Sequence, residues 1–254
     1  MRTIYKTSLG VILDALFPLS KAEEELLQLS VEEAFSKLPP APAYDRSVVP
    51  LPATRSIFAY KDERVSKLVW SIKYKKSAHS IQIGGYALFQ TLKKLTKNDS
   101  STSPAKTTSS QNFEIILVPI PITSRRRRER GFNQCELLLD EVRRLDVENK
   151  FTHEKNLICR VQHTSRQTLK GRDERLESSK GIFSVNEKVA QQIRQIKQKS
   201  QQINIKDDQT CRPSSEQLIV VLDDVITTGS TMKEALDVLK SAGFSNVAGL
   251  SLAH

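Results

Sequence analysis

Residues 219–231 have the sequence IVVLDDVITTGST, and this stretch is the strongest indication of fold and function in the chain. Its first four residues are apolar and mostly β-branched, which predicts a buried strand of a parallel sheet. Asp223 and Asp224 follow at the carboxyl end of that strand, where open α/β sheets bind their ligands. Hydroxyl residues and Gly229 then lead into a helical pattern over 231–242 with one broad apolar face. We therefore expect an anion at this helix N-terminus, because free backbone N–H groups and the helix dipole favour negative charge.

The chemistry of this stretch suits a phosphorylated sugar. Hydroxyls and amides suit a phosphate monoester, and paired carboxylates suit a sugar diol or a ligand bridged by Mg²⁺. The segment resembles the 5-phosphoribosyl-1-pyrophosphate (PRPP) signature of the type I phosphoribosyltransferases. That resemblance implies that Asp223 and Asp224 hold the ribose hydroxyls, and that the 5-phosphate is held by Thr227, Thr228, Gly229, Ser230 and Thr231. The alternative is an ordinary strand followed by a solvated acidic turn and a capped helix. That alternative does not explain why so many consecutive residues match the PRPP signature.

A second polar motif follows another apolar strand pattern, at 113–118. Residues 118–134 read VPIPITSRRRRERGFNQ, so an arginine-rich segment lies just beyond that strand, again at the ligand edge of the sheet. Arginine side chains suit bidentate phosphate binding. Taken alone, this run is equally well explained by a solvated basic turn or by one end of a helix.

With this motif the chain resembles the ComF family, a branch of the phosphoribosyltransferase superfamily named for bacterial competence and including gluconate-utilisation relatives. The family pattern V-P-x-P and R-x-x-x-R-G-F-N-Q is matched at Val118, Pro119, Pro121, Arg126, Arg130, Gly131, Phe132, Asn133 and Gln134. The next family pattern, T-x-x-Q and then R-L-x-N, is matched except that Ser178 replaces the Asn. Type I enzymes close a mobile hood over pyrophosphate, so the resemblance implies pyrophosphate or loop contacts for Arg126, Arg130, Gly131, Gln134, Thr164, Gln167 and Arg175. Lys73 either faces the phosphates as well or is an ordinary surface lysine.

Composition limits the partners and the compartment. The formal net charge of +10 favours nucleic acid, phosphorylated metabolites or an anionic membrane surface without choosing among them. No apolar run approaches the roughly 18 residues of a membrane span, and no signal-peptide pattern is present, so we expect a cytoplasmic protein without a membrane span. The three cysteines and four histidines lack ligand spacing, and no zinc is expected.

Strand patterns that alternate with helical patterns predict an α/β fold with a mainly parallel sheet flanked by helices. The resemblance makes this fold type I phosphoribosyltransferase-like. We expect a small cysteine-free N-terminal extension over 1–55, a degenerate counterpart of the zinc ribbon in many family members. The phosphoribosyltransferase-like domain is expected over 56–254, with polar insertions at 96–111 and 187–216.

Helical spacing runs over 22–38 and 64–74, and Trp70 is expected to pack in the core. Other strands are predicted at 56–60, 156–161, 181–185 and 247–252, and other helices at 81–95 and 133–145.

Three functional hypotheses follow. The first is a PRPP-binding, Mg²⁺-dependent phosphoribosyltransferase, with Mg²⁺ held mainly by substrate and water and in part by Asp223 and Asp224. Its acceptor is not identified, because Thr227 stands where the similar loop of the 6-oxopurine enzymes carries an acidic base. The second is a non-catalytic protein that binds PRPP and single-stranded DNA, with partners in the competence machinery, as the family name implies. The third is an interaction module with a relic motif, against which the intact Asp223, Asp224 and Gly229 argue.

Overall fold

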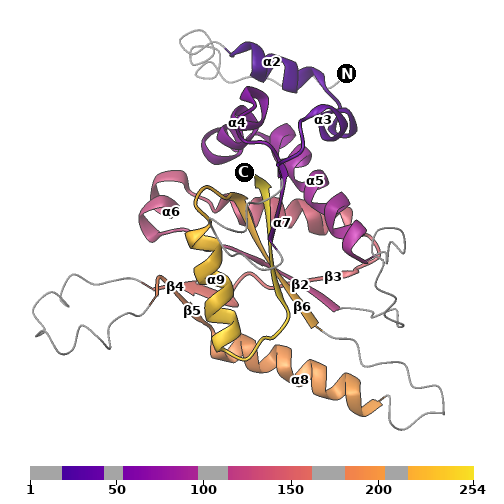
Figure 1. Cartoon of the computed structure of the whole chain (residues 1–254), viewed down its shortest axis with the longest axis vertical. Coiled ribbons are helices and arrows are strands. Elements are labelled where there is room, and N and C mark those ends of the chain that lie inside the picture. The colour runs from indigo at the N-terminus through magenta and orange to yellow at the C-terminus, as the bar shows by residue number, and fades with distance from the viewer. Residues whose placement is uncertain (1–18, 43–53, 97–113, 162–180, 204–216) are drawn as a thin grey trace, which may run out of the picture.

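The computed structural model describes residues 19–42, 54–96, 114–161, 181–203 and 217–254 (Figure 1). A five-stranded sheet lies at its centre, in the order β1-β7-β6-β2-β3, and every pair of neighbouring strands is parallel. The strands are β1 (Thr54–Phe58), β2 (Glu114–Pro119), β3 (Phe151–His153), β6 (Gln217–Val225) and β7 (Val247–Ala253). This arrangement confirms the predicted α/β class and is consistent with a phosphoribosyltransferase-like fold.

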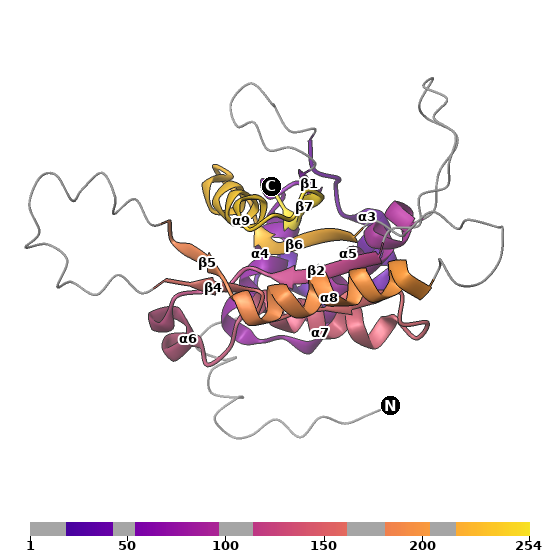
Figure 2. The same ribbon diagram turned by 90° about the horizontal axis from the view of Figure 1, so that it is seen from below.

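Helices cover both faces of the sheet (Figures 1 and 2). The covering helices are α5 (Ala78–Thr96) and α7 (Gln134–Leu145) on one face, and α8 (Glu187–Ile203) and α9 (Ser230–Ser241) on the other. Successive side chains of the central strand β6 alternate between these layers: Val220 and Leu222 pack in the α5/α7 core, and Ile219 and Val221 pack in the α8/α9 core. All four are almost completely buried, which explains the uninterrupted apolar run in the sequence.

The amino-terminal part packs onto the α5/α7 side. It consists of α2 (Lys21–Gln28) and α3 (Val31–Lys37), which lie against α4 (Glu63–Trp70) and α5, at the top of Figure 1. The single helical segment predicted over 22–38 is therefore wrong in detail. Ser30 ends it, because its hydroxyl accepts from the Glu33 N–H while the Glu33 carboxylate accepts from the Ser30 N–H, which starts a new helix.

The segment after α4 is a π-helix, η1 (Ser71–Lys75), where the sequence predicts a continuous α-helix. Trp70, the last residue of α4, is 42% exposed, so the expectation that it packs in the core is wrong. Its ring lies on the outer face, with Lys67 and Lys75 over it at 5.8 and 4.9 Å from the centroid. The indole is therefore covered by lysine side chains rather than by the core.

Three elements differ from the sequence-based expectation at the edges of the fold. The predicted strands around 158 and 183 exist as β4 (Ile158–Arg160) and β5 (Phe183–Val185), but they form a separate antiparallel pair. The edge strand β3 was not predicted. The polar segment predicted over 187–216 begins with a helix, as expected: this is α8, whose Ala190 and Ile193 are buried against the sheet.

The remaining part of the predicted insertions, at 97–111 and 204–216, lies outside the described residues. Within the described ranges, no helix combines the length and the apolar character that crossing a membrane requires.

Candidate functional site

The candidate site lies where the carboxyl ends of β2, β6 and β7 meet. Asp223 and Asp224 lie near the carboxyl end of β6, the middle strand of the sheet. Backbone hydrogen bonds hold this edge together: the Ile120 N–H donates to the Leu222 carbonyl at 2.9 Å, and the Ile226 N–H donates to the Ala253 carbonyl at 3.0 Å. The carboxylates therefore stand on a framework fixed on both sides, as expected at the ligand edge of a parallel sheet.

Asp224 is 4% exposed and faces the α5/α7 side, because it has the same parity along β6 as Val220 and Leu222. Its Oδ1 accepts from the Val225 N–H at 2.8 Å. Its Oδ2 lies 3.0 Å from Lys73 Nζ and accepts no well-aligned hydrogen bond within the described ranges. The structure therefore answers one of the questions left open by the sequence: Lys73 points inward to the carboxylate and is not an ordinary surface lysine.

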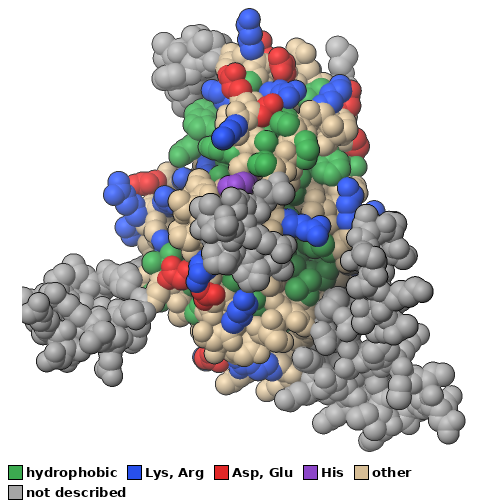
Figure 3. Space-filling model, viewed as in Figure 1, with side chains coloured by type: hydrophobic (Ala, Val, Ile, Leu, Met, Phe, Trp, Pro, Cys, Tyr) green, Lys and Arg blue, Asp and Glu red, His purple; other side chains and the backbone are tan. Residues whose placement is uncertain are grey.

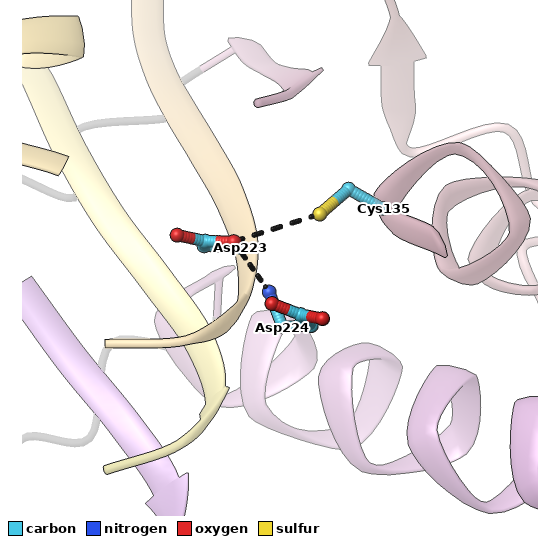
Figure 4. A group of neighbouring side chains, drawn as sticks. All are labelled: Cys135, Asp223 and Asp224. Atoms are coloured by element: carbon cyan, nitrogen blue, oxygen red, sulfur yellow. Dashed lines mark hydrogen bonds between the residues drawn. The ribbon is translucent and has the colours of Figure 1, made fainter. Parts of the chain in front are cut away.

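Asp223 lies beside Asp224 and close to a thiol (Figure 4). Its Oδ1 accepts from the Asp224 N–H at 2.8 Å, and Cys135 Sγ, at the start of α7, lies 3.7 Å away. Burial, and then the negative charge of Asp224, raise the pKa of Asp223 well above its usual range. Burial and the two carboxylates likewise raise the pKa of the Cys135 thiol, which is therefore protonated and unreactive.

Cys135, Asp223 and Asp224 bring three potential metal-binding atoms within 4.8 Å of one another. The two carboxylates fit Mg²⁺, which prefers oxygen, whereas a protonated thiol is a poor ligand for that ion. Cys135 was not identified from the sequence as a site residue. Its position directly after the G-F-N-Q motif was the available signal, because Asn133 caps α7 and so places the next residues at the sheet edge.

The loop after β6 has the geometry that the sequence predicts. Gly229 is the N-cap of α9 and has φ 77°, a left-handed conformation that favours glycine. Gly229 carries no side chain that could cap the helix; within the described residues the Ser230 N–H has the Thr228 hydroxyl as a distant acceptor, at 3.5 Å. The Thr227, Thr228 and Ser230 side chains are exposed there, with the Thr228 and Ser230 hydroxyls 3.1 Å apart.

The His254 side chain contacts the start of this loop, and this contact could not be predicted from the sequence. Its Nδ1 lies 2.9 Å from the Ile226 carbonyl, at the start of the loop. Its backbone N–H donates to Phe58 and its carbonyl accepts from the Tyr60 N–H, at 3.0 and 2.8 Å. His254 therefore connects β1 with the loop, a relation that only the strand order could show.

The arginine-rich segment is a short exposed helix, α6 (Ser124–Arg130), capped by Thr123 and ended by Gly131 at φ 78°. In Figure 3, Lys and Arg side chains gather at the left, where Figure 1 places α6. Arg130 donates to Gln134 Oε1 at 3.0 Å and lies over the Tyr74 ring at 5.0 Å, so Arg130 connects η1 with the buried Gln134 at the start of α7. Arg126 is exposed, and no ion pair joins the α6 arginines to Asp223 or Asp224 in the described structure.

Of the predicted hood residues, Thr164, Gln167 and Arg175 lie outside the described residues. The structure therefore brings together Lys73, Asp223, Asp224 and the loop, and places Arg130 next to Tyr74, the neighbour of Lys73 in the chain.

Comparison with known proteins supports the resemblance drawn from the motifs. No protein-family model matches the chain. The chain is 28% identical over 151 residues to competence protein F of Haemophilus influenzae, and the alignment covers 59% of this chain and 55% of that protein. The chain is thus a distant homologue of a competence protein F, and it spans about half the length of that relative.

Proposed function

We propose that this distant homologue of the ComF family binds PRPP, or a related phosphorylated pentose, with Mg²⁺, and acts as a phosphoribosyltransferase-like protein. One observation carries the proposal. A single segment supplies a carboxylate pair at the end of the central strand and, a few residues later, a helix N-terminus whose N-cap is Gly229 and whose first N–H has only a distant hydroxyl acceptor, at 3.5 Å. The pair suits a ribose diol, and the helix N-terminus suits a 5-phosphate.

The remaining groups suit the rest of such a ligand. Arg130, which is half-buried and held by the buried Gln134 at 3.0 Å, is the group that we assign to a pyrophosphate attached to C1 of the ribose. When bound, Mg²⁺ would neutralise charge on the pyrophosphate and stabilise it as a leaving group. The protein's own task would be to position the ligand and to stabilise charge, since the exposed Thr227 hydroxyl cannot serve as a general base at neutral pH. We assign no acceptor, and ligand binding is the part of the proposal to test first.

Calorimetric titration with PRPP, in Mg²⁺ and then in EDTA, tests the proposal. We expect saturable, Mg²⁺-dependent binding that weakens by at least about 100-fold in the Asp223→Asn/Asp224→Asn double variant, because charge-assisted hydrogen bonds to the diol are lost. Asp237→Asn, on the exposed side of α9, is the matched control and should bind as the wild type does. An unchanged dissociation constant in the double variant, or no binding by the wild type, would refute the proposal.

A second candidate function is binding of single-stranded DNA. Trp70 and Tyr74 are 42% and 58% exposed, their rings lie 5.8 Å apart, and cationic side chains flank both rings. Exposed aromatic rings among cations are typical of surfaces on which successive bases stack. The net charge of +10 favours the same partner.

Fluorescence anisotropy with an oligothymidylate about 20 nucleotides long tests the second candidate. We expect binding at low salt that weakens steeply between about 50 and 200 mM salt. Trp70→Ala should weaken it by about tenfold, as expected for the loss of one stacked base. No binding at low salt, or binding without salt dependence, would exclude this function.

A further inference from the structure

Three lysines within four positions of the chain, at the end of η1, contact three different elements. Lys75 Nζ pairs with Glu23 at 2.8 Å, and Lys76, which has φ 50°, lies over the Phe132 ring at 5.7 Å. Lys73 Nζ pairs with Asp224 Oδ2 at 3.0 Å. The π-helical turn sends one lysine to the candidate site and its neighbours to other elements, and such turns are frequent at functional sites.

The environment of the Lys73–Asp224 pair differs from that of the other lysine pairs. The two side chains are 21% and 5% exposed. A carboxylate buried to this degree requires a compensating positive charge. Lys73 supplies that charge from a flexible four-carbon side chain, which is itself partly exposed.

A ligand at Asp224 would approach the same oxygen. A divalent cation or a sugar hydroxyl on Asp224 Oδ2 would compete with the lysine for it, because that oxygen has no other well-aligned partner in the described ranges. Lys73 and a bound cation or hydroxyl therefore cannot both contact Asp224 Oδ2.

We propose that Lys73 is an exchangeable counter-ion: it neutralises Asp224 in the ligand-free protein and leaves that carboxylate when a cation or a diol binds there. The ammonium is then free to contact an anionic group of the same ligand, a step that rests on the proposed function. Lys73 is in this view a positioning residue that couples occupation of the carboxylate to recognition of the phosphates.

Titration with Mn²⁺ alone tests the exchange without any sugar ligand. Lys73→Met should bind Mn²⁺ more tightly than the wild type, by at least about tenfold, because a competing positive charge next to the carboxylate is removed. Lys155→Met is the matched control, since Lys155 pairs with Asp140 at 2.5 Å on the surface, and it should leave Mn²⁺ affinity unchanged. Equal affinity in Lys73→Met and the wild type would overturn the proposal.

Two further variants show whether a change in Mn²⁺ affinity comes from a folding defect rather than from the loss of the Lys73 charge. Lys73→Arg keeps the charge and should bind Mn²⁺ as the wild type does. Lys73→Met/Asp224→Asn removes both partners and should fold, with no gain in Mn²⁺ affinity. A gain that persists in this double variant would show that the metal binds elsewhere and would also overturn the proposal.

PRPP with Mg²⁺ tests the second step. At Mg²⁺ concentrations that saturate the carboxylate in both proteins, Lys73→Met should bind PRPP about tenfold more weakly than the wild type and Lys155→Met, because the competition with Mg²⁺ is then removed in both and only the contact of the freed ammonium is missing. Unchanged PRPP affinity would overturn this step. The two failures are distinguishable: if the wild type does not bind PRPP but Lys73→Met gains Mn²⁺ affinity, the proposed function is wrong and the exchange stands. If PRPP binds but Mn²⁺ affinity does not change, the exchange is wrong and the function stands.

Discussion

Two groups of charged side chains stand at the carboxyl edge of the sheet, and the fold holds them very differently. Asp223 and Asp224 lie on the central strand, within the sheet, and backbone N–H groups bond both carboxylates. The arginines of α6 lie on a seven-residue helix with no buried residue. Arg125 and Arg127 pair with the glutamates Glu129 and Glu136 near the surface.

We call Asp223, Asp224 and the loop that follows them the rigid side of the site, and the arginines of α6 its adaptable side. Exposed ion pairs contribute about 0–1 kcal/mol, so the arginines of α6 can exchange their glutamate partners for a ligand at little cost. The carboxylates cannot move without disturbing the backbone of β6, and they are preorganised for one ligand position. On the proposed function, a charged ligand would therefore meet carboxylates held by the backbone, from which only Lys73 must withdraw, and would recruit the arginines of α6.

Gly229→Val should have the largest effect on the rigid side. Gly229 has φ 77°, where a β-branched residue is strained, and the loop must shift to accept it. We expect PRPP affinity to fall by about 100-fold or more, because the N–H groups of the loop lose their alignment. The free energy of unfolding should fall by about 1–3 kcal/mol. Calorimetry and denaturant unfolding measure the two effects.

Gly243→Val separates strain from ligand recognition. Gly243 also has positive φ, at 90°, and a Cβ there would contact nothing within 4 Å. It lies at the opposite end of α9 from the loop. This variant should lose similar stability and keep its PRPP affinity. Equal loss of affinity in both glycine variants would mean that the loop has no special role.

A smaller effect should appear in the pH dependence of stability at Asp223. Burial and Asp224 raise its folded pKa above the usual value of 3.8, so the folded protein holds this proton more strongly than the unfolded chain. Stability therefore falls as pH rises from about 3.8 through the raised folded pKa. Asp223→Asn removes this cost, and its free energy of unfolding relative to the wild type should be higher at about pH 7 than at about pH 4. A difference that is independent of pH would show that Asp223 ionises normally.

The rigid side could be predicted from the sequence because it is encoded in one short segment. The apolar run, the two aspartates and the glycine follow one another in the chain, and their spacing alone predicts strand, carboxylates and helix N-terminus. The strand, the carboxylates at its end and the helix are confirmed, and ligand binding by these residues stays a prediction.

The surroundings of that segment could not be predicted in the same way, because they come from distant parts of the chain. Lys73 reaches Asp224 from 151 positions away in the numbering, and His254 reaches Ile226 only because β7 is the neighbour of β6. Trp70 was misplaced because its apolar side chain was given more weight than its position: the buried face of this segment is formed by Val65, Leu68, Val69 and Ile72, and Trp70 lies off that face. Sequence periodicity holds no information on such pairings between elements.

Substitutions in α6 should have the smallest effect and would sharpen the contrast with the rigid side. The Arg125 side chain is 83% exposed and, among the residues that the structure describes, pairs with Glu129, one turn away at 2.7 Å. Arg125→Gln should leave the unfolding midpoint unchanged within error, because an exposed pair of this kind is screened by solvent. Arg130→Gln, on the same helix, loses the bond to Gln134 and the contact with Tyr74, and should weaken PRPP binding about tenfold. Thermal melts and PRPP titrations of both variants measure the two effects. If Arg125→Gln destabilised the protein measurably, α6 would be fixed by its own ion pairs, and the adaptable side of the site would be as rigid as the sheet edge it faces.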